Sequence, residues 1–481
     1  MKRHDADNLP PSNQANARRY ELDWLRALVV LGLIPYHAAV VFAIGPGDYV
    51  KNAQRSLVFD VAATLVSFWG MPLLFFVAGA ATWFALGRRA PRRYLAERTL
   101  RLAVPFVVGV FALVPVQLYF ERRALPGFNL NYVQFYGGYL VDWIHIAQHG
   151  VFGLGFQYWG HLWFVLYLFA VSVLLLPLLL WLRGAGARRA LTALSLVVRN
   201  GHTRLSMFLP TFVIFALFGA PFALAEATLQ GPIGPRASTD YANLYSGPAG
   251  LVLYAVAFII GYVLYADRGF QGALARLRWM ALALALMLLA LHEGLLLATD
   301  QQFVSDPWGS LLIRVLRGYI TWLCLVAILG FALRRLAVDT PALRYLTEAS
   351  LPLYVLHMPI LTVIGFYLVS WDIPLAAKFF LLVVATVGAT FGVYEGAIRR
   401  IPFARVLFGL KPQNDGHQHE RPTMKPRIRQ ALQSIATAPT RAQQWAPKQT
   451  APPTAGRRQR QSANPRAISH RARSQTRAPL R

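Results

Sequence analysis

Ten apolar stretches, each close to twenty residues long, constrain the fold of this chain more than any other feature. They run at about 22–44, 58–84, 102–120, 162–182, 208–225, 248–266, 279–298, 310–333, 350–371 and 375–397. About 20 apolar residues in a helix cross the hydrocarbon core of a bilayer. A chain with 56 % hydrophobic and only 14 % charged residues does not have the composition of a soluble domain. We therefore expect an all-α polytopic membrane protein with about ten transmembrane helices.

The charges between the stretches predict the topology. The loops on one side, together with the N-terminus, hold 21 Lys and Arg, and the loops on the other side hold six. Cytoplasmic loops carry the excess of Lys and Arg, so an even number of spans places both termini in the cytoplasm. Residues 1–19 are polar and lack the apolar core and cleavage site of a signal peptide. We expect this segment to be a cytoplasmic N-terminus and residues 20–400 to form the transmembrane domain.

The C-terminal segment, residues 411–481, has a different composition. It holds fifteen Lys and Arg against two acidic residues, which leaves +13 of the total net charge of +27. A segment rich in Pro, Gln, Arg and Ser buries too little apolar surface to offset its ordering entropy, so we expect a disordered basic tail. Its charge suits anionic membrane lipid, and we expect no nucleic acid. The single cysteine, Cys324, excludes an internal disulfide or a Cys-based zinc site, and no metal site is expected.

The first stretch carries Asp23, Arg26 and His37. Eleven residues separate Arg26 from His37, which is about 16 Å along a helix axis. If Arg26 lies at the cytoplasmic edge, His37 lies past the middle of the bilayer, where an ionisable side chain is by default a functional hypothesis. The alternative is a helix-end arginine and a hydrogen-bonded core histidine. Asp23 is three residues before Arg26, a spacing that allows an ion pair.

Two further polar patterns lie near the cytoplasmic side. Arg98 and Arg101 are three residues apart, so an α-helix would place both on one face. Two guanidiniums there suit phosphate groups, or they simply flank a span on its positive side. Ser350, Tyr354 and His357 form one stripe at i, i+4 and i+7. The alternative for this stripe is a structural row of hydrogen bonds between helices.

Other ionisable residues lie toward the outer side: His161, His292, Glu293, Arg314 and Arg317. Each of them alone is compatible with a core or snorkelling side chain. Together with His37 they predict a polar column that connects the two membrane faces. The loop expected at 121–160 is rich in aromatic residues, which suits either sugar rings or an interfacial aromatic belt.

The order and spacing of these patterns resemble the acyltransferase 3 family of bacterial membrane proteins. The residues that carry the resemblance are Tyr20-Glu-Leu-Asp23-Trp-Leu-Arg26 with His37, Met71-Pro72-Leu-Leu-Phe-Phe76-Val-Ala-Gly79, Arg98-x-x-Arg101 before Pro105, His161-Leu-Trp163-Phe164, and Ser350-x-x-x-Tyr354-x-x-His357. They cover about residues 19–398. The first two motifs look most like the branch that includes the osmoregulated periplasmic glucan succinyltransferase.

The resemblance implies a multi-pass O-acyltransferase of the bacterial inner membrane. Such a protein takes an acyl group from a cytoplasmic donor, an acyl-CoA co-substrate, and places it on a hydroxyl of an extracytoplasmic glycan, with no bound cofactor. In this hypothesis His37 is the general base and Arg26 supports it. The donor side holds Arg98, Arg101, Tyr354 and His357, the last two lining the donor path or steadying the oxyanion. The acceptor side or its support holds Asp23, His161, Trp163 and Arg317.

Several alternatives stay open at this stage. A transporter or flippase for an acidic or sugar-linked solute also fits ten spans with intramembrane charges. His37 can serve as a base or can itself carry the acyl group between two half-reactions. The acyl group, acetyl or succinyl, and the oligomeric state are not fixed by the sequence.

Overall fold

A computed structural model of the chain describes residues 18–45, 50–149, 156–200, 205–229, 248–298 and 306–411. Within these ranges every regular element is a helix, as the apolar stretches predict. The N-terminal segment up to residue 17 and the basic tail from residue 412 lie outside the described residues, so their predicted disorder stays a prediction.

The helices follow one another along the chain without long described loops. They are α2 (Tyr20–Phe42), α3 (Leu57–Ser67), α4 (Gly70–Arg88), α5 (Pro91–Arg98), the π-helical turn η1 (Thr99–Ala103), α6 (Val104–Ala112), α7 (Val114–Arg123), α8 (Tyr132–His149), α10 (Phe156–Trp159), the 3-10 turn η2 (Gly160–Leu162), α11 (Trp163–Leu174), α12 (Leu176–Leu182), α13 (Ala185–Asn200), α14 (Leu205–Leu229), α16 (Pro248–Leu264), α17 (Arg268–Ala298), α19 (Pro307–Arg335), α20 (Pro341–Leu368), α21 (Leu375–Val393), the π turn η3 (Tyr394–Ile398) and α22 (Pro402–Leu407).

Seven helical runs in the described part of the chain are long and apolar enough to cross a membrane. An eighth is added if Gly160–Leu174 and Leu176–Leu182, which are bent by 53°, count as one span. Two shorter apolar helices, Phe215–Ala227 and Gly250–Leu264, lie at the predicted fifth and sixth spans. The protein is thus a multi-pass integral membrane protein, whereas neither the predicted count of ten nor the orientation of the termini is confirmed.

The segment expected to be a loop at 121–160 contains a helix of 18 residues, α8. Its start is a reciprocal capping arrangement: the Asn131 side chain accepts from the backbone N–H of Gln134 at 3.0 Å, and the Gln134 side chain accepts from the backbone N–H of Asn131 at 3.1 Å. Such a pair satisfies two donors at a helix start. The aromatic residues and glycines of the segment favour a loop by composition, whereas this capping pair favours a helix. The Tyr139 hydroxyl ties α8 to α6 by donating to the Val110 carbonyl at 2.8 Å.

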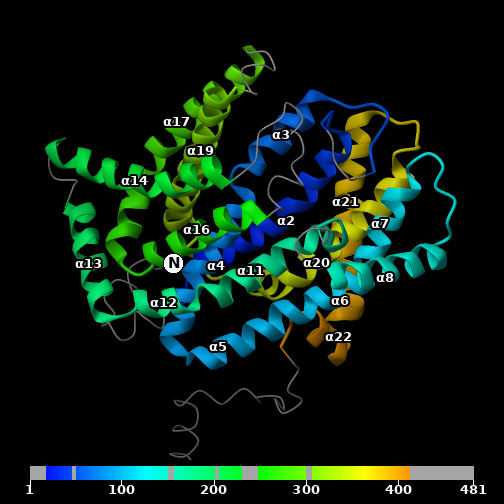
Figure 1. The fold of residues 1–481 in the computed structure, drawn as a ribbon, viewed down its shortest axis with the longest axis horizontal. Helices are drawn as coiled ribbons and strands as arrows, with labels where there is room; N and C mark the ends of the chain where they lie inside the picture. The colour runs from blue at the N-terminus through cyan, green and yellow to red at the C-terminus, as the bar shows by residue number, and fades with distance from the viewer. Residues whose placement is uncertain are drawn as a thin grey trace, which may run out of the picture. The chain divides into compact units, whose positions relative to one another are not determined.

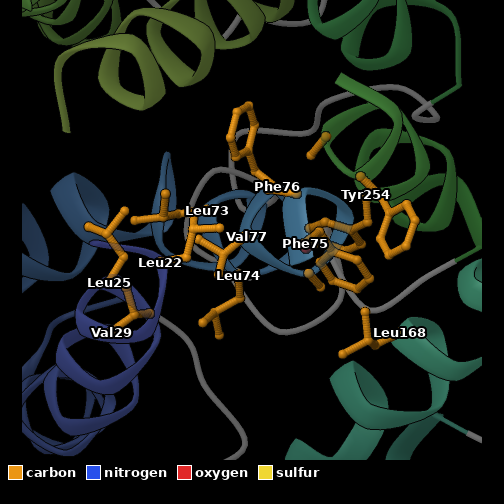
Figure 2. Packing of buried hydrophobic residues seen from close by; sticks show 14 of the residues in the cluster. Leu22, Leu25, Val29, Leu73, Leu74, Phe75, Phe76, Val77, Leu168 and Tyr254 are labelled. Carbon is orange, nitrogen blue, oxygen red and sulfur yellow. The ribbon is translucent and has the colours of Figure 1, made fainter. Parts of the chain in front are cut away.

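Helix α2 packs against α20, α21, α3 and α4, which come from both ends of the described chain. Figure 1 shows α2 in blue beside the yellow and gold α20 and α21. On its other side α4 contributes a fully buried aromatic core. Figure 2 shows Phe75 of α4 against Tyr254 of α16, with ring centroids 4.5 Å apart and nearly parallel. The first helix is therefore held both by the helices that follow it, α3 and α4, and by α20 and α21, which are remote in the sequence.

Lys51 and Asp60 fix the C-terminal end of α2. Lys51 Nζ donates to the carbonyl oxygens of Val40 at 2.7 Å and Gly45 at 2.9 Å. A cation there complements the helix dipole, although burial lowers the pKa of Lys51 to about 8. The Asp60 carboxylate of α3 accepts from the backbone N–H of Ile44 at 2.7 Å. These contacts set the position of the chain just beyond His37.

Gly79 and Gly261 allow α4 and α16 to approach with their backbones in contact. A Cβ on Gly79 would overlap the carbonyl oxygen of Phe258, and one on Gly261 would overlap the carbonyl oxygen of Phe76. Neither oxygen can rotate away, because both belong to helical backbone. Small residues at such crossings are typical of helix packing in membranes.

We expect Gly79→Ala to destabilise the protein by about 1–3 kcal/mol, the usual cost of overpacking. The measurement is thermal unfolding in detergent, followed by the loss of the monodisperse chromatographic peak. Gly32→Ala is the control, since a Cβ at Gly32 meets nothing within 4 Å. On helix propensity alone it should stabilise the protein by up to about 1 kcal/mol. Equal effects of the two substitutions would show that the crossing does not depend on Gly79.

Candidate active site

Three histidines from distant parts of the sequence meet in the helical bundle. The ring of His357 on α20 lies 5.4 Å from the ring of His37 on α2 and 5.4 Å from that of His161 in η2. His161 and His357 are buried, and His37 is half-buried. In the described segments no group of three or more His, Cys, Asp or Glu is arranged to hold a metal ion. Imidazole nitrogens are groups that accept and donate protons near neutral pH.

The histidine at position 161 is held by hydrogen bonds on both ring nitrogens. Its Nδ1 lies 3.0 Å from the Gln117 Oε1, and its Nε2 lies 3.0 Å from the Val355 carbonyl oxygen. The Gln117 amide is oriented by its Nε2, which donates to Glu121 at 2.8 Å. The Tyr354 hydroxyl also donates to the backbone carbonyl of His161. The Val355 carbonyl only accepts, so Nε2 carries the N–H of the neutral ring, and Nδ1 is covered by the Gln117 side chain. Neither nitrogen of His161 is open to a substrate.

His357 presents the opposite arrangement. Its Nδ1 donates to the carbonyl oxygen of Tyr354, because a carbonyl only accepts. The lone pair of the neutral ring is therefore on Nε2, which has no hydrogen-bond partner among the described residues. The ring is only 1 % exposed and faces His37. Ser350, the first member of the predicted stripe, instead donates to the carbonyl oxygen of Leu346 in its own helix.

Four arginines gather toward the N-terminal end of α2. Arg26 Nη1 lies 3.8 Å from Asp23, as the i, i+3 spacing predicts, and Arg18 Nε lies 2.7 Å from the same carboxylate. Arg98 and Arg101 are close enough to Arg26 for their charges to repel it. The Arg26 side chain keeps 35 % of its surface exposed. Neighbouring guanidiniums that are still accessible suit an anionic ligand such as a phosphate.

The backbone at the arginine pair differs from the α-helix that the sequence predicts. Helix α5 ends at Arg98, and Arg101 lies in the π-helical turn η1. Pro105 has no N–H to donate to the carbonyl of residue 101, and its ring crowds that carbonyl, which favours a wider turn. Arg98 Nη2 donates to Thr82 Oγ1 at 3.0 Å, and its guanidinium lies over the ring of Tyr94 at 5.2 Å. Arg98 is thus anchored, whereas Arg101 is exposed.

Trp163 packs away from the histidines, against Tyr254, with ring centroids 5.3 Å apart. Tyr254 is fully buried, and its hydroxyl has no hydrogen-bond partner among the described residues. It lies within electrostatic range of both Tyr354 and Glu226. Trp163 therefore supports a buried tyrosine that is near a residue of the histidine cluster and near a second polar cluster.

Arg317 belongs to that second cluster, in which Glu226 is the central acid. Arg317 Nε lies 3.9 Å from Glu226 Oε2, and Arg314 and His292 also interact electrostatically with this carboxylate. The residues of the predicted polar column thus fall into two clusters, and Tyr254 is within electrostatic range of residues from both. Neither Glu226 nor Gln117 was singled out from the sequence. Both are polar residues in or beside apolar stretches, which is the signal that marks a functional candidate in a membrane span.

Comparison with known proteins agrees with these features. A family model described as an acyltransferase domain matches residues 19–395, which include all three histidines and the three arginines of α2, α5 and η1. The chain is 22 % identical over 397 residues to the Glucans biosynthesis protein C of Escherichia coli O6:K15:H31 (strain 536), which is 82 % of this chain and 95 % of the relative. The proteins of that name from Escherichia coli K12 and SMS-3-5 have the same identity and coverage. No solved structure matches the chain. This chain belongs to the acyltransferase 3 family and is a membrane-embedded enzyme that transfers acyl groups.

Proposed function

We propose that this protein is an O-acyltransferase of the bacterial inner membrane with about ten spans and both termini in the cytoplasm. It moves an acetyl or succinyl group from a cytoplasmic acyl-CoA to a hydroxyl of an extracytoplasmic glycan. The observation that carries the proposal is the separation of two clusters along α2. Accessible arginines lie toward its N-terminal end, and the histidines lie about 16 Å farther along the helix. The name of the relatives supports a glycan acceptor.

The donor side of the mechanism is electrostatic. Coenzyme A carries phosphates, and Arg98 and Arg101 are the guanidiniums we assign to them, with Arg26 beside them. Tyr354 and His357 stay candidates for lining the donor path. A role for them as oxyanion donors is less favoured. The Tyr354 hydroxyl already donates to the backbone carbonyl of His161. His357 already donates from Nδ1 to the Tyr354 carbonyl, so in the neutral ring only the acceptor Nε2 is left.

The chemical step needs a base, because a sugar hydroxyl is a weak nucleophile at neutral pH. We assign this role to His37, which takes the hydroxyl proton as the oxygen attacks the thioester carbonyl. The tetrahedral intermediate then collapses, the carbon–sulfur bond breaks, and the proton is returned to the leaving coenzyme A thiolate. His357 lies next to His37, its Nε2 has no hydrogen-bond partner in the part of the chain that the structure describes, and it can share the proton. His161 positions His357 rather than reacting.

Gln117→Leu tests the positioning role of His161. The substitution removes the polar side chain that lies against Nδ1 and leaves this buried nitrogen without its partner, a loss of about 1–3 kcal/mol. We expect turnover to fall about tenfold with donor affinity unchanged, as measured by steady-state transfer and by equilibrium binding of acyl-CoA. Glu121→Gln, which still accepts from the Gln117 amide, should retain nearly full turnover. Full activity of Gln117→Leu would remove the assigned role.

The acceptor and the acyl group are identified together by mass spectrometry of surface glycans from a strain that lacks this gene. We expect one acyl mass to be missing from one glycan class. Complementation with the wild-type gene should restore it, and complementation with the His37→Ala variant should not. Unchanged glycans in the deletion strain would contradict the proposed reaction.

A further inference from the structure

A cavity of about 280 Å³ lies beyond the C-terminal end of α2, between α3, α17 and α19. Most of its wall is apolar, with Phe68 as its aromatic member. The polar side chains on the wall include Asp60, His292, Glu293 and Arg317. A mostly apolar hollow with a few convergent polar groups is the usual form of a small-molecule site.

His292 and Glu293 form a hydrogen-bonded pair on this wall. His292 Nδ1 lies 3.0 Å from Glu293 Oε1, so the ring donates from Nδ1 to the carboxylate. Its Nε2 therefore carries a lone pair, and this atom has no hydrogen-bond partner among the described residues. The residue is 2 % exposed, and its ring packs edge-on against Phe68 at 5.4 Å. A buried acceptor without a partner costs about 1–3 kcal/mol, which a ligand hydroxyl would recover.

The charges around the cavity favour a neutral ligand that both donates and accepts hydrogen bonds. Arg317 supplies donors, and its guanidinium lies over the Phe68 ring at 5.6 Å. Asp60 and Glu293 lie on the same wall as Arg317, and Glu226 lies 3.9 Å from Arg317. Lys51 is near Asp60 and Arg314 is near Glu226, so the charges around the cavity balance and favour neither an anion nor a cation. A hydroxyl satisfies both kinds of group, because it donates to an imidazole or carboxylate and accepts from a guanidinium.

The cavity lies at the histidine end of α2. Ile44 lines it, two residues beyond the end of α2 at Phe42 and seven residues beyond His37. The arginines near Arg26 are at the other end of the same helix. Tyr254 is within electrostatic range of Glu226 in the second cluster and of Tyr36 and Tyr354, which neighbour the histidines.

We propose that this cavity binds one neutral sugar unit of the acceptor. His292 Nε2 accepts a hydrogen bond from one hydroxyl, and Arg317 donates to another. That the sugar belongs to the acceptor rests on the proposed function, whereas the sugar site itself does not. Because the cavity is separated from His37, it holds a part of the glycan that does not react. Its binding energy then serves to orient the unit that does.

A cysteine-protection assay tests the site on the full-length protein. In a Cys324→Ser background, which removes the only native cysteine, Val61→Cys places a thiol on the cavity wall. Glucose, methyl glucoside and short glucose oligosaccharides are the probes, and a small methanethiosulfonate reagent is the label. A site of millimolar affinity slows labelling about tenfold at roughly 10 mM sugar, by simple competition. Val58→Cys on the same helix, 71 % exposed and outside the cavity, should show no protection.

Substitutions of His292 test the contact itself in the Val61→Cys background. His292→Phe keeps the packing against Phe68 and removes Nε2, so it should lose the protection while the labelling rate without sugar stays the same. His292→Gln restores an acceptor near the position of Nε2 and should recover part of the protection. Protection that is equal in both variants would overturn the assignment to His292.

Failure of this inference is distinct from failure of the proposed function. Suppose that no sugar slows the labelling of Val61→Cys, although the protein is monodisperse and still transfers acyl groups. The cavity then holds only water, and this inference alone is overturned. Protection in a protein that transfers no acyl group overturns the proposed function alone. His37→Ala should keep the protection and lose the transfer.

Discussion

His37→Ala should lower acyl transfer by about 10²–10⁴-fold, the range that a positioned general base supplies. The measurement is transfer of a labelled acyl group to glycan in membrane vesicles, normalised to the amount of protein. The physical reason is that the acceptor hydroxyl loses the group that takes its proton. His145→Ala is the matched control, since His145 is an exposed histidine on α8, and it should leave transfer unchanged. Full activity of His37→Ala at normal protein levels would remove His37 from the mechanism.

The same variant separates the two roles open to His37. If His37 carries the acyl group, donor alone should label the wild-type protein covalently, and His37→Ala should remain unlabelled. If His37 acts as a base, neither protein is labelled without acceptor. We expect the second result, because His357 presents its Nε2 lone pair beside His37 and can share the proton.

The double variant Arg98→Ala with Arg101→Ala should weaken the binding of acyl-CoA about ten- to hundredfold. A hydrogen bond to a charged group contributes about 1.5–3 kcal/mol, and each 1.4 kcal/mol is tenfold in affinity. The exposure of Arg101 favours the lower end of this range. The measurement is equilibrium binding of acyl-CoA to the purified protein at two salt concentrations, since screening reduces the contribution of exposed charges.

Arg92→Ala with Arg93→Ala is the control for donor binding. Both arginines are exposed on α5, and the change in net charge is the same. If this control weakens binding as much as the Arg98 and Arg101 variant, the effect is a general surface potential and not a phosphate site. Unchanged affinity of the Arg98 and Arg101 variant would exclude the donor clamp.

The apolar stretches predicted an all-helical membrane protein, which the described residues confirm, whereas the count of ten spans is not confirmed and the roles of the candidate residues stay predictions. A single apolar stretch inside a bilayer satisfies its own backbone hydrogen bonds only as a helix. Helices occupy each of the ten predicted stretches. The position of His37 on α2 and of His357 on α20 also followed from periodicity. Their contact did not, because pairing between α2 and α20 depends on which faces of two apolar helices match. When a helix is apolar on all faces, its sequence does not indicate which face packs against which neighbouring helix.

The features that the sequence left out have local physical causes. The π turn at Arg101 follows from the missing N–H of Pro105, an effect that α-helical spacing ignores. The segment of helix α8 was predicted to be a loop from its aromatic and glycine content, and the capping pair at Asn131 and Gln134 was not recognised. The roles of Gln117 and Glu226 emerge only from contacts across the bundle. Hydrogen bonds to His161 and the ion pair with Arg317 join residues far apart in the chain.

Proteoliposomes with acyl-CoA outside and a glucose oligosaccharide sealed inside test the central claim, which is that donor and acceptor sites face opposite sides of the membrane. The acyl group carries the label, and vesicles that hold His37→Ala are the control. The account predicts covalently labelled oligosaccharide inside the wild-type vesicles, with one coenzyme A released outside for each acyl group transferred. Entry of an unattached labelled solute without release of coenzyme A, as a transporter would give, would contradict the account. So would transfer that requires donor and acceptor on the same side.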